Sequence, residues 1–124
     1  MRSDTGHTFG GYASVPWKIS SCHTNAAGCF LFLVENPHGD APTCFECKDD
    51  GHAIAACSNH GPQFGWGDLT IPQTFPNPSN PAYMEKGGSI GFPSSYTDTL
   101  GRGNATFTGA KKFNLEDYEV WAAT

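Results

Sequence analysis

The sequence predicts a mainly β protein, an antiparallel two-layer β-sandwich with long loops and little helix. The 15 Gly and 9 Pro interrupt nearly every window of a dozen residues, so no amphipathic helical stripe of useful length remains. The apolar residues instead come in short pieces separated by turn residues, as in β-sandwiches. Because 124 residues is the length of one ordinary domain, we expect a single domain over residues 1–124.

The strands are expected, in chain order, at residues 9–15, 29–35, 43–48, 53–57, 68–71, 105–108 and 116–122. Residues 29–34 are apolar at every position, which is typical of a central strand covered on both faces. Gly10 and Gly11 indicate a bulge or a close approach to the backbone. The Pro- and Gly-rich stretch 72–95 predicts a long surface excursion with little regular structure. Trp17 and Trp121 are expected to anchor the ends of the core.

Charge and hydropathy exclude two classes of partner. The net charge is -5 with only seven Lys and Arg, and the one adjacent basic pair is Lys111-Lys112, so nucleic acid is not expected as a partner. The longest apolar run, residues 29–34, is far shorter than the roughly 20 residues that span a bilayer, so no transmembrane segment is expected. The first residues have no apolar signal-peptide core. We therefore expect an intracellular, cytoplasmic location, although Met1 need not be the native start.

The cysteines raise the question of a metal site. Five of them occur, with His side chains interleaved: Cys22, Cys29, Cys44, Cys47 and Cys57. Only Cys44 and Cys47 form a C-x-x-C pair, and on a strand these two would point to opposite faces, so they could not share one ion without a local turn. Free thiols are the expectation. A disulfide among Cys22, Cys29, Cys44 and Cys47, or a zinc site, stays open, and no metal ligand or cofactor is assigned.

Two patterns resemble catalytic motifs but lack the required context. Residues 87–91 satisfy G-x-S-x-G, yet a nucleophile elbow needs a strand before it and a helix after it, and the flanking residues predict neither. Asp117 and Glu119 have a spacing that glycosidases use, but they alternate with apolar residues as on any amphipathic strand. We therefore assign no catalytic residue and predict that the protein is not an enzyme. The sequon at Asn104 would matter only in a secreted protein.

Aromatic and aliphatic residues supply a candidate partner surface. Large apolar side chains near loops can form a protein-binding hot spot or a sugar-stacking platform, although many such residues simply pin loops to the sandwich. The candidate residues are Phe30, Phe32, Val34, Phe75, Tyr83, Phe92 and Tyr96.

Several segments, taken in order, resemble the TLDc domain family. Residues 9–17 resemble the FGGY-x-S-x-PW segment of the family, and residues 30–33 resemble the FLF strand that follows. Residues 53–65 are similar to a strand that leads into a YGP-x-FG-type turn, and residues 67–71 stand where the family has a Gly-rich turn and a D-L strand. The closing F-x-G and E-[IV]-E-[VIW]-W segments resemble residues 107–109 and 113–122.

The resemblance implies a β-sandwich with a few short helices and no catalytic constellation. It also implies a non-catalytic interaction domain, a subunit or adaptor of a larger assembly, with links to oxidative-stress resistance and to the vacuolar proton pump. The chain begins about a quarter of the way into the family pattern, so an uncovered sheet edge or apolar face is expected. Two alternatives stay open: a thiol-based oxidative-protection enzyme, for which Cys22 beside His23 is the local candidate, and a secreted carbohydrate-binding sandwich.

Overall fold

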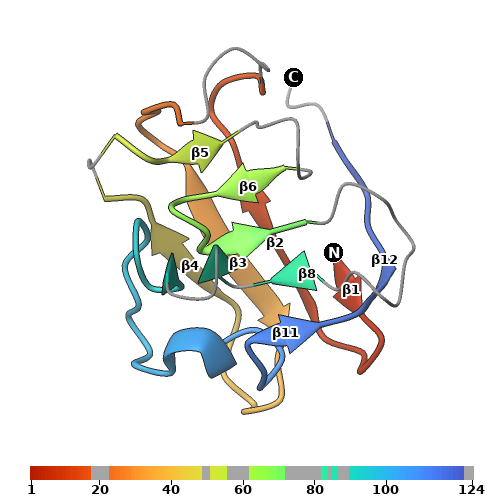
Figure 1. Ribbon diagram of the computed structural model, residues 1–124. Helices are drawn as coiled ribbons and strands as arrows, with labels where there is room; N and C mark the ends of the chain where they lie inside the picture. The colour runs from red at the N-terminus through yellow and green to blue at the C-terminus, as the bar shows by residue number, and fades with distance from the viewer. Residues whose placement is uncertain are drawn as a thin grey trace.

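The computed structural model describes residues 1–17, 23–48, 51–55, 62–71, 82–83, 85–86 and 90–121. These residues form antiparallel β-strands, with one short 3-10 helix at Gly103–Ala105 (Figure 1). The mainly β, antiparallel class predicted from the Gly and Pro distribution is therefore confirmed.

The first sheet has five strands in the order β12-β1-β2-β3-β4, and each pair of neighbours is antiparallel. Its centre is the β2–β3 pair, which joins the N-terminal segment to the most apolar strand of the chain. The strands are β1 (Arg2–Ser3), β2 (Thr8–Tyr12), β3 (Phe30–Glu35), β4 (Thr43–Glu46) and β12 (Leu115–Asp117).

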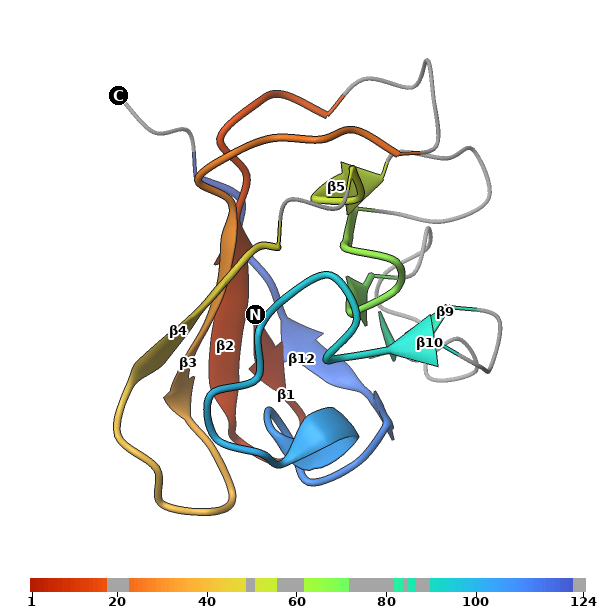
Figure 2. The same ribbon diagram turned by 90° about the vertical axis from the view of Figure 1, so that its left-hand side faces the viewer.

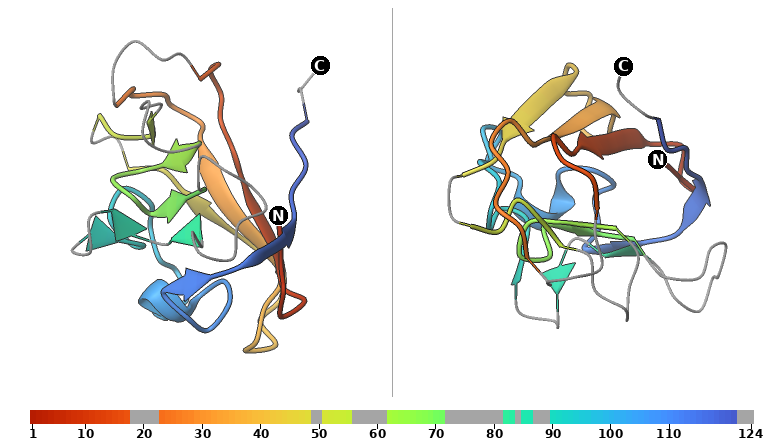
Figure 3. Two further views of the ribbon diagram at one scale, coloured as in Figure 1. Left: turned by 45° about the vertical axis from the view of Figure 1, so that its right-hand side comes forward. Right: turned by 90° about the horizontal axis from the view of Figure 1, so that it is seen from above.

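The second sheet packs against one side of the first (Figures 2 and 3), in the order β11-β8-β7-β6-β5. A third, two-stranded ladder joins β9 and β10. The strands are β5 (Ile54–Ala55), β6 (Gln63–Phe64), β7 (Leu69–Thr70), β8 (Ala82–Tyr83), β9 (Glu85–Lys86), β10 (Ile90–Gly91) and β11 (Lys112–Phe113).

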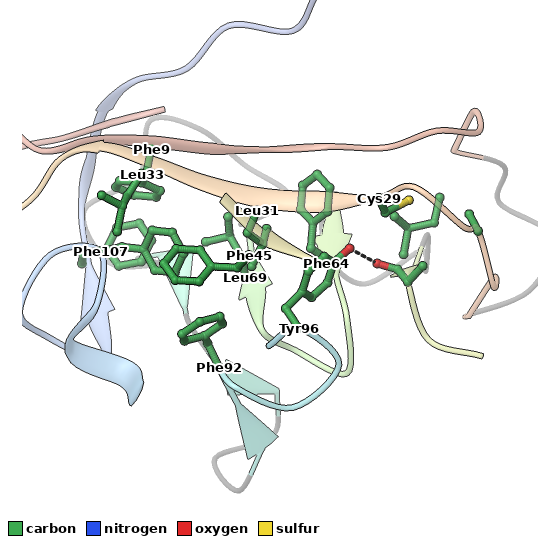
Figure 4. Packing of buried hydrophobic residues seen from close by; sticks show 14 residues of the cluster. Phe9, Cys29, Leu31, Leu33, Phe45, Phe64, Leu69, Phe92, Tyr96 and Phe107 are labelled. Carbon is green, nitrogen blue, oxygen red and sulfur yellow. Dashed lines mark hydrogen bonds between the residues drawn. The ribbon is translucent and has the colours of Figure 1, made fainter. Parts of the chain in front are cut away.

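The core lies between the two large sheets and follows from alternation along the strands. Successive side chains on a strand point to opposite faces, and Leu31, Leu33 and Phe45 are buried while their immediate neighbours in β3 and β4 are more exposed. Phe45, Phe92 and Phe107 meet in edge-to-face contacts, with ring centroids 5.1 to 5.6 Å apart (Figure 4). This geometry is favoured because the positive edge of one ring faces the negative face of the next.

Most of the expected strands are present, though shorter than predicted. The expected strand at 105–108 is wrong: the chain there forms the 3-10 helix and a turn. Local hydrogen bonds close this segment: the backbone N–H and the hydroxyl of Thr106 both donate to the carbonyl oxygen of Gly103, and the N–H of Gly109 donates to that of Ala105. Asp98 fixes the loop that leads into it, because its carboxylate accepts the backbone N–H groups of Leu100, Gly101 and Gly103 at 2.8 to 3.0 Å.

Three further expectations need correction. The last strand ends at Asp117 rather than continuing to 122, and Trp121 is 83% exposed, so it does not anchor the core. Trp17 does pack on the core, edge-to-face against Phe64 at 5.2 Å. The stretch 72–95 contains the short strands β8, β9 and β10, so it is more regular than expected; residues 72–81, 84 and 87–89 lie outside the described residues, as do 56–57 of another expected strand.

Within the described part of the chain, we find no helix with the length and hydropathy that a membrane span requires.

Candidate protein-binding surface

The outer face of the first sheet carries a group of large apolar side chains. The register pairs Tyr12 with Phe30, and the two rings stack with centroids 5.1 Å apart and planes 24° from parallel. Phe32, the next residue on the same face, has its ring centroid 6.3 Å from that of Phe30. Val34 continues the row at 44% exposure, and Tyr12 is 38% exposed. We call Tyr12, Phe30, Phe32 and Val34 the aromatic face.

Gly10 explains why the Phe32 ring lies flat on this face. A Cβ atom on Gly10 would lie 2.6 Å from Cζ of Phe32, so only glycine leaves room for the ring to cover the neighbouring strand. The close approach predicted from the two adjacent glycines is therefore confirmed. The prediction that β3 is covered on both faces is wrong for the described residues, because the second sheet lies on the opposite side (Figures 2 and 3). The contacts between the Tyr12, Phe30 and Phe32 rings bury part of the apolar surface that a covering layer would otherwise bury.

The rim of the aromatic face is polar and acidic. Cys44 lies opposite Phe32 in the register, and Glu46 lies opposite Phe30; both side chains are exposed. At the other end, Glu35 accepts a hydrogen bond from the Thr8 hydroxyl at 2.8 Å. An apolar centre with a charged rim is the usual arrangement of a protein-binding patch.

The predicted partner residues divide into two groups. Phe30, Phe32 and Val34 are brought together on the aromatic face. Phe92 and Tyr96 are 2% and 0% exposed, so their place on a binding surface needs correction: they are core residues, buried because β10 and the turn after it fold over the sheet interior. Phe75 and the side chain of Tyr83 lie outside the described residues.

A buried carboxylate, Asp68, organises the loops at one end of the sandwich. Its oxygens accept the backbone N–H groups of Ser94, Ser95 and Tyr96 at 2.8 to 3.2 Å. Gly65 permits this arrangement, because its φ is +67° and a Cβ atom there would overlap the Asp68 carboxylate. Burial raises the pKa of Asp68 to about 6, against the opposing effect of the three N–H donors and of Lys48.

A second polar cluster joins three aromatic rings. His23 stacks on Trp66 with centroids 4.4 Å apart, and His52 makes edge contacts with both rings at 4.8 and 4.7 Å. The backbone bridge between Thr24 and Ile54 holds two of the three segments together. The cluster therefore holds the loops together at this end of the sandwich through its ring-to-ring contacts.

The catalytic patterns are not assembled into a site among the described residues. The strands β9 and β10 on either side of the G-x-S-x-G segment pair with each other in antiparallel register, so the context is a hairpin and not a strand-turn-helix elbow; Ser89 lies outside the described residues. Asp117 and Glu119 are both exposed, and Glu119 accepts a hydrogen bond from the Trp121 indole at 3.1 Å. Asn104 of the sequon lies in the 3-10 helix.

The cysteines that the structure describes are free thiols: Cys29, Cys44 and Cys47. Cys44 is exposed on the outer side of β4, whereas Cys47 is half-buried three residues later. Cys22 and Cys57 lie outside the described residues. Across the part of the chain that the structure places, no three His, Cys, Asp or Glu side chains gather as a metal-ion site.

We expect the purified chain to carry less than one zinc ion per molecule. The physical reason is that Cys44 is exposed on β4, whereas Cys47 lies just past the end of this strand, bridges to Tyr96 and packs half-buried against the core. We therefore do not expect the two thiols of the single C-x-x-C pair to ligate one ion together. Elemental analysis after dialysis measures the zinc content. One zinc per chain, together with unfolding on addition of a chelator, would contradict this expectation.

Comparison with known families agrees with the segment-by-segment resemblance. The TLDc domain family model matches residues 1–124. The chain belongs to the TLDc domain family. No curated protein and no solved structure shows significant similarity to it. The roles of the aromatic face and of Asp68 are therefore assigned from the geometry of this TLDc domain alone.

The sequence alone does not point to two of these features. Asp68 falls within residues 67–71, which resemble the D-L strand of the family, and the signal for its role is the preceding Gly65, which leaves room for a carboxylate. Tyr12 falls within the FGGY-like segment 9–17, and its stacking on Phe30 depends on a strand register that the sequence does not specify.

Proposed function

We propose that this TLDc domain is a non-catalytic protein-interaction domain, a subunit or adaptor of a larger assembly, and that it binds its partner through the aromatic face. The observation that carries the proposal is the row of Tyr12, Phe30, Phe32 and Val34 on the side of the first sheet away from the core. Contiguous exposed apolar residues with a polar rim mark interaction sites.

The composition of the face favours a protein as the partner. Aromatic side chains bury a large area at a low cost in side-chain entropy, which is why Tyr and Phe are enriched in the centres of protein interfaces. The carboxylates of Glu35 and Glu46 at the rim favour a partner with Lys or Arg around an apolar centre. The chain has only seven Lys and Arg and a net charge of -5, which also favours a basic partner.

The finer parts of the proposal rest on the family resemblance. By that resemblance we extend the interaction hypothesis to three points: an intracellular, cytoplasmic location, a role in oxidative-stress resistance, and the vacuolar proton pump as one partner. Each is tested by identifying the protein that contacts the aromatic face.

Substitution of Val34 by lysine should weaken partner binding about ten-fold or more, because a charge would then be placed against the apolar centre of the interface. Ala110→Lys is the matched control, since it adds the same charge at an exposed residue of a different segment. A photo-reactive amino acid at position 34, compared with one at position 110, identifies the contacting protein. Titration calorimetry with that purified protein then measures the affinity of each variant.

Three results would contradict the aromatic face as the binding surface. One is equal binding by the Val34→Lys and Ala110→Lys chains. Another is crosslinking that is stronger from position 110 than from position 34. The third is the absence of apolar dye binding by the wild-type chain, or dye fluorescence that does not fall in a Tyr12→Lys, Val34→Lys double variant of unchanged melting temperature.

A further inference from the structure

Cys29 and Cys47 are direct neighbours across the β3–β4 pair. The register that pairs Phe30 with Glu46 brings Cys29 opposite Cys47 one step further on. The backbone N–H of Cys47 donates to the carbonyl oxygen of Cys29 at 3.2 Å, so the two lie opposite each other just beyond the last pair of the ladder. Residues opposite each other on antiparallel strands have Cα atoms roughly 4.5 to 5.5 Å apart. That separation is inside the range of about 4.4 to 6.8 Å that disulfides span.

The two side chains also share the inner face of the sheet. Alternation along β3 places Cys29 on the side of Leu31, and alternation along β4 places Cys47 on the side of Phe45; both Leu31 and Phe45 are buried. Cys44 differs from Cys47 by an odd number of residues and is exposed on the other side. Among the described cysteines, the sheet geometry therefore selects one pair.

Tyr96 lies beside Cys47 at this end of the core. Its backbone bridges to Cys47, and its buried phenol donates to the carbonyl oxygen of Ala53 at 2.6 Å. Burial first, and then the neighbouring groups of Cys47 and Cys29, raise the pKa of Tyr96. In Figure 4, Cys29 lies at the end of the core beyond Phe64 and Tyr96.

Both thiols take part in weak, local hydrogen bonds. The Cys29 sulfur accepts a hydrogen bond from the Ser14 backbone N–H at 3.4 Å, and the Cys47 thiol donates to the carbonyl oxygen of Lys48 at 3.0 Å. Thiols are weak donors and weak acceptors, so the loss of these two hydrogen bonds costs little when a sulfur atom moves. Cys47 is half-buried and Cys29 is 2% exposed, so an oxidant in solution reaches Cys47 first.

We propose that Cys29 and Cys47 are a reversible oxidation site, which closes to an intramolecular disulfide when the chain reacts with a hydroperoxide. The Cys47 thiolate attacks the terminal oxygen of the hydroperoxide, the O–O bond breaks, and the products are the Cys47 sulfenic acid and an alcohol. The Cys29 sulfur then attacks the Cys47 sulfur and expels water. Two thiols and one hydroperoxide thus give one disulfide, one alcohol and one water.

The bond would close the hairpin that carries the aromatic face. Phe30 and Phe32 lie on β3 directly after Cys29, and β4 ends directly before Cys47. A disulfide at this point constrains the unfolded chain between residues 29 and 47, so the oxidised chain should melt at a higher temperature than the reduced chain. Reduction by a dithiol should restore the original melting temperature.

Disulfide mapping on the full chain tests the proposal. The chain is treated with tert-butyl hydroperoxide, digested without reduction, and analysed by mass spectrometry. We expect a crosslinked peptide pair that contains Cys29 and Cys47, lost in the Cys47→Ser chain and retained in the Cys44→Ser chain. Cys44→Ser is the matched control because Cys44 lies on the same strand and points to the other face.

The same experiment separates the alternatives. A bridge from Cys29 to Cys22, Cys44 or Cys57, a crosslinked dimer, or sulfinic acid at Cys47 without any bridge would each overturn the proposal. If Cys47→Ser fails to fold, Cys47→Ala and Cys29→Ala replace it. A peroxide-induced rise in melting temperature that is as large in both folded variants as in the wild-type chain would also overturn the proposal. None of these results depends on the partner that the aromatic face binds.

Discussion

Replacement of Asp68 by alanine should lower the free energy of unfolding by about 3 kcal/mol, because two buried backbone N–H groups and one partly buried N–H group would lose their acceptor and each buried loss costs roughly 1 to 3 kcal/mol. We expect this loss at pH 5. The buried groups belong to Ser95 and Tyr96 and the partly buried one to Ser94, and Asp68 itself is 0% exposed. Urea unfolding of the two chains measures the difference.

Asp98→Ala is the matched control. Asp98 also accepts three backbone N–H groups, those of Leu100, Gly101 and Gly103, but the Gly101 bond is exposed, the other two are only partly buried, and Asp98 itself is only half-buried. Water can therefore replace much of what the substitution removes, and the loss should be clearly smaller. Equal losses for the two substitutions would show that burial at Asp68 is not what makes its hydrogen bonds important.

The effect at Asp68 should depend on pH. Burial raises the pKa of Asp68 from 3.8 to about 6, so the folded chain binds this proton more tightly than the unfolded chain. The contribution of Asp68 to stability is then fully present below pH 4 and decreases as the pH rises through 6. The gap in unfolding free energy between wild type and Asp68→Asn should narrow from pH 4 to pH 7. A gap that stays constant or widens would contradict the raised pKa.

Gly11→Ala should destabilise the fold by up to about 3 kcal/mol, which is typical of forcing an extra methyl group into a packed core. A Cβ atom at this position would lie 2.5 to 2.7 Å from three atoms of the Phe64 ring. Phe64 is 3% exposed and is itself in edge contact with Trp17 and Tyr96, so its ring has no free space to enter. Either the sheet separation or the ring packing must change.

Gly10→Ala provides the comparison, since it adds the same methyl group one residue earlier. Its Cβ atom would lie 2.6 Å from the Phe32 ring, but Phe32 is on the aromatic face and can swing toward solvent. We expect a loss of well under half of that at Gly11, measured by thermal or urea unfolding. If Gly10→Ala were the more damaging of the two, the assignment of inner and outer faces to β2 would be wrong.

Much of the fold could be predicted from short-range patterns. The apolar run 29–34, the alternation around Phe45 and the spacing of turn residues identify β3, β4 and the mainly β class, because strand formation at these positions depends on local side-chain pattern. The adjacent glycines predicted a close approach, and two phenylalanine rings approach them.

The remaining features depended on contacts between residues far apart in the chain. The segment 105–108 has a strand-like composition, but hydrogen bonds to the Gly103 carbonyl and burial of Phe107 against Phe45 fix it as the end of a 3-10 helix and a turn. Phe92 and Tyr96 have the composition of a binding surface and are core residues. Asp68 holds the turn between them, because it accepts the backbone N–H groups of Ser94, Ser95 and Tyr96.

The sequence by itself determined the fold class, the positions of most of the longer strands along the chain and the family, since these follow from the local apolar period and from segments that occur in a fixed order. Only the tertiary structure decided which aromatic residues are exposed, which carboxylate is buried and which cysteines are neighbours. Those three properties depend on the register between strands and on which face of a sheet the second sheet covers, and neither is encoded in the pattern of a single strand.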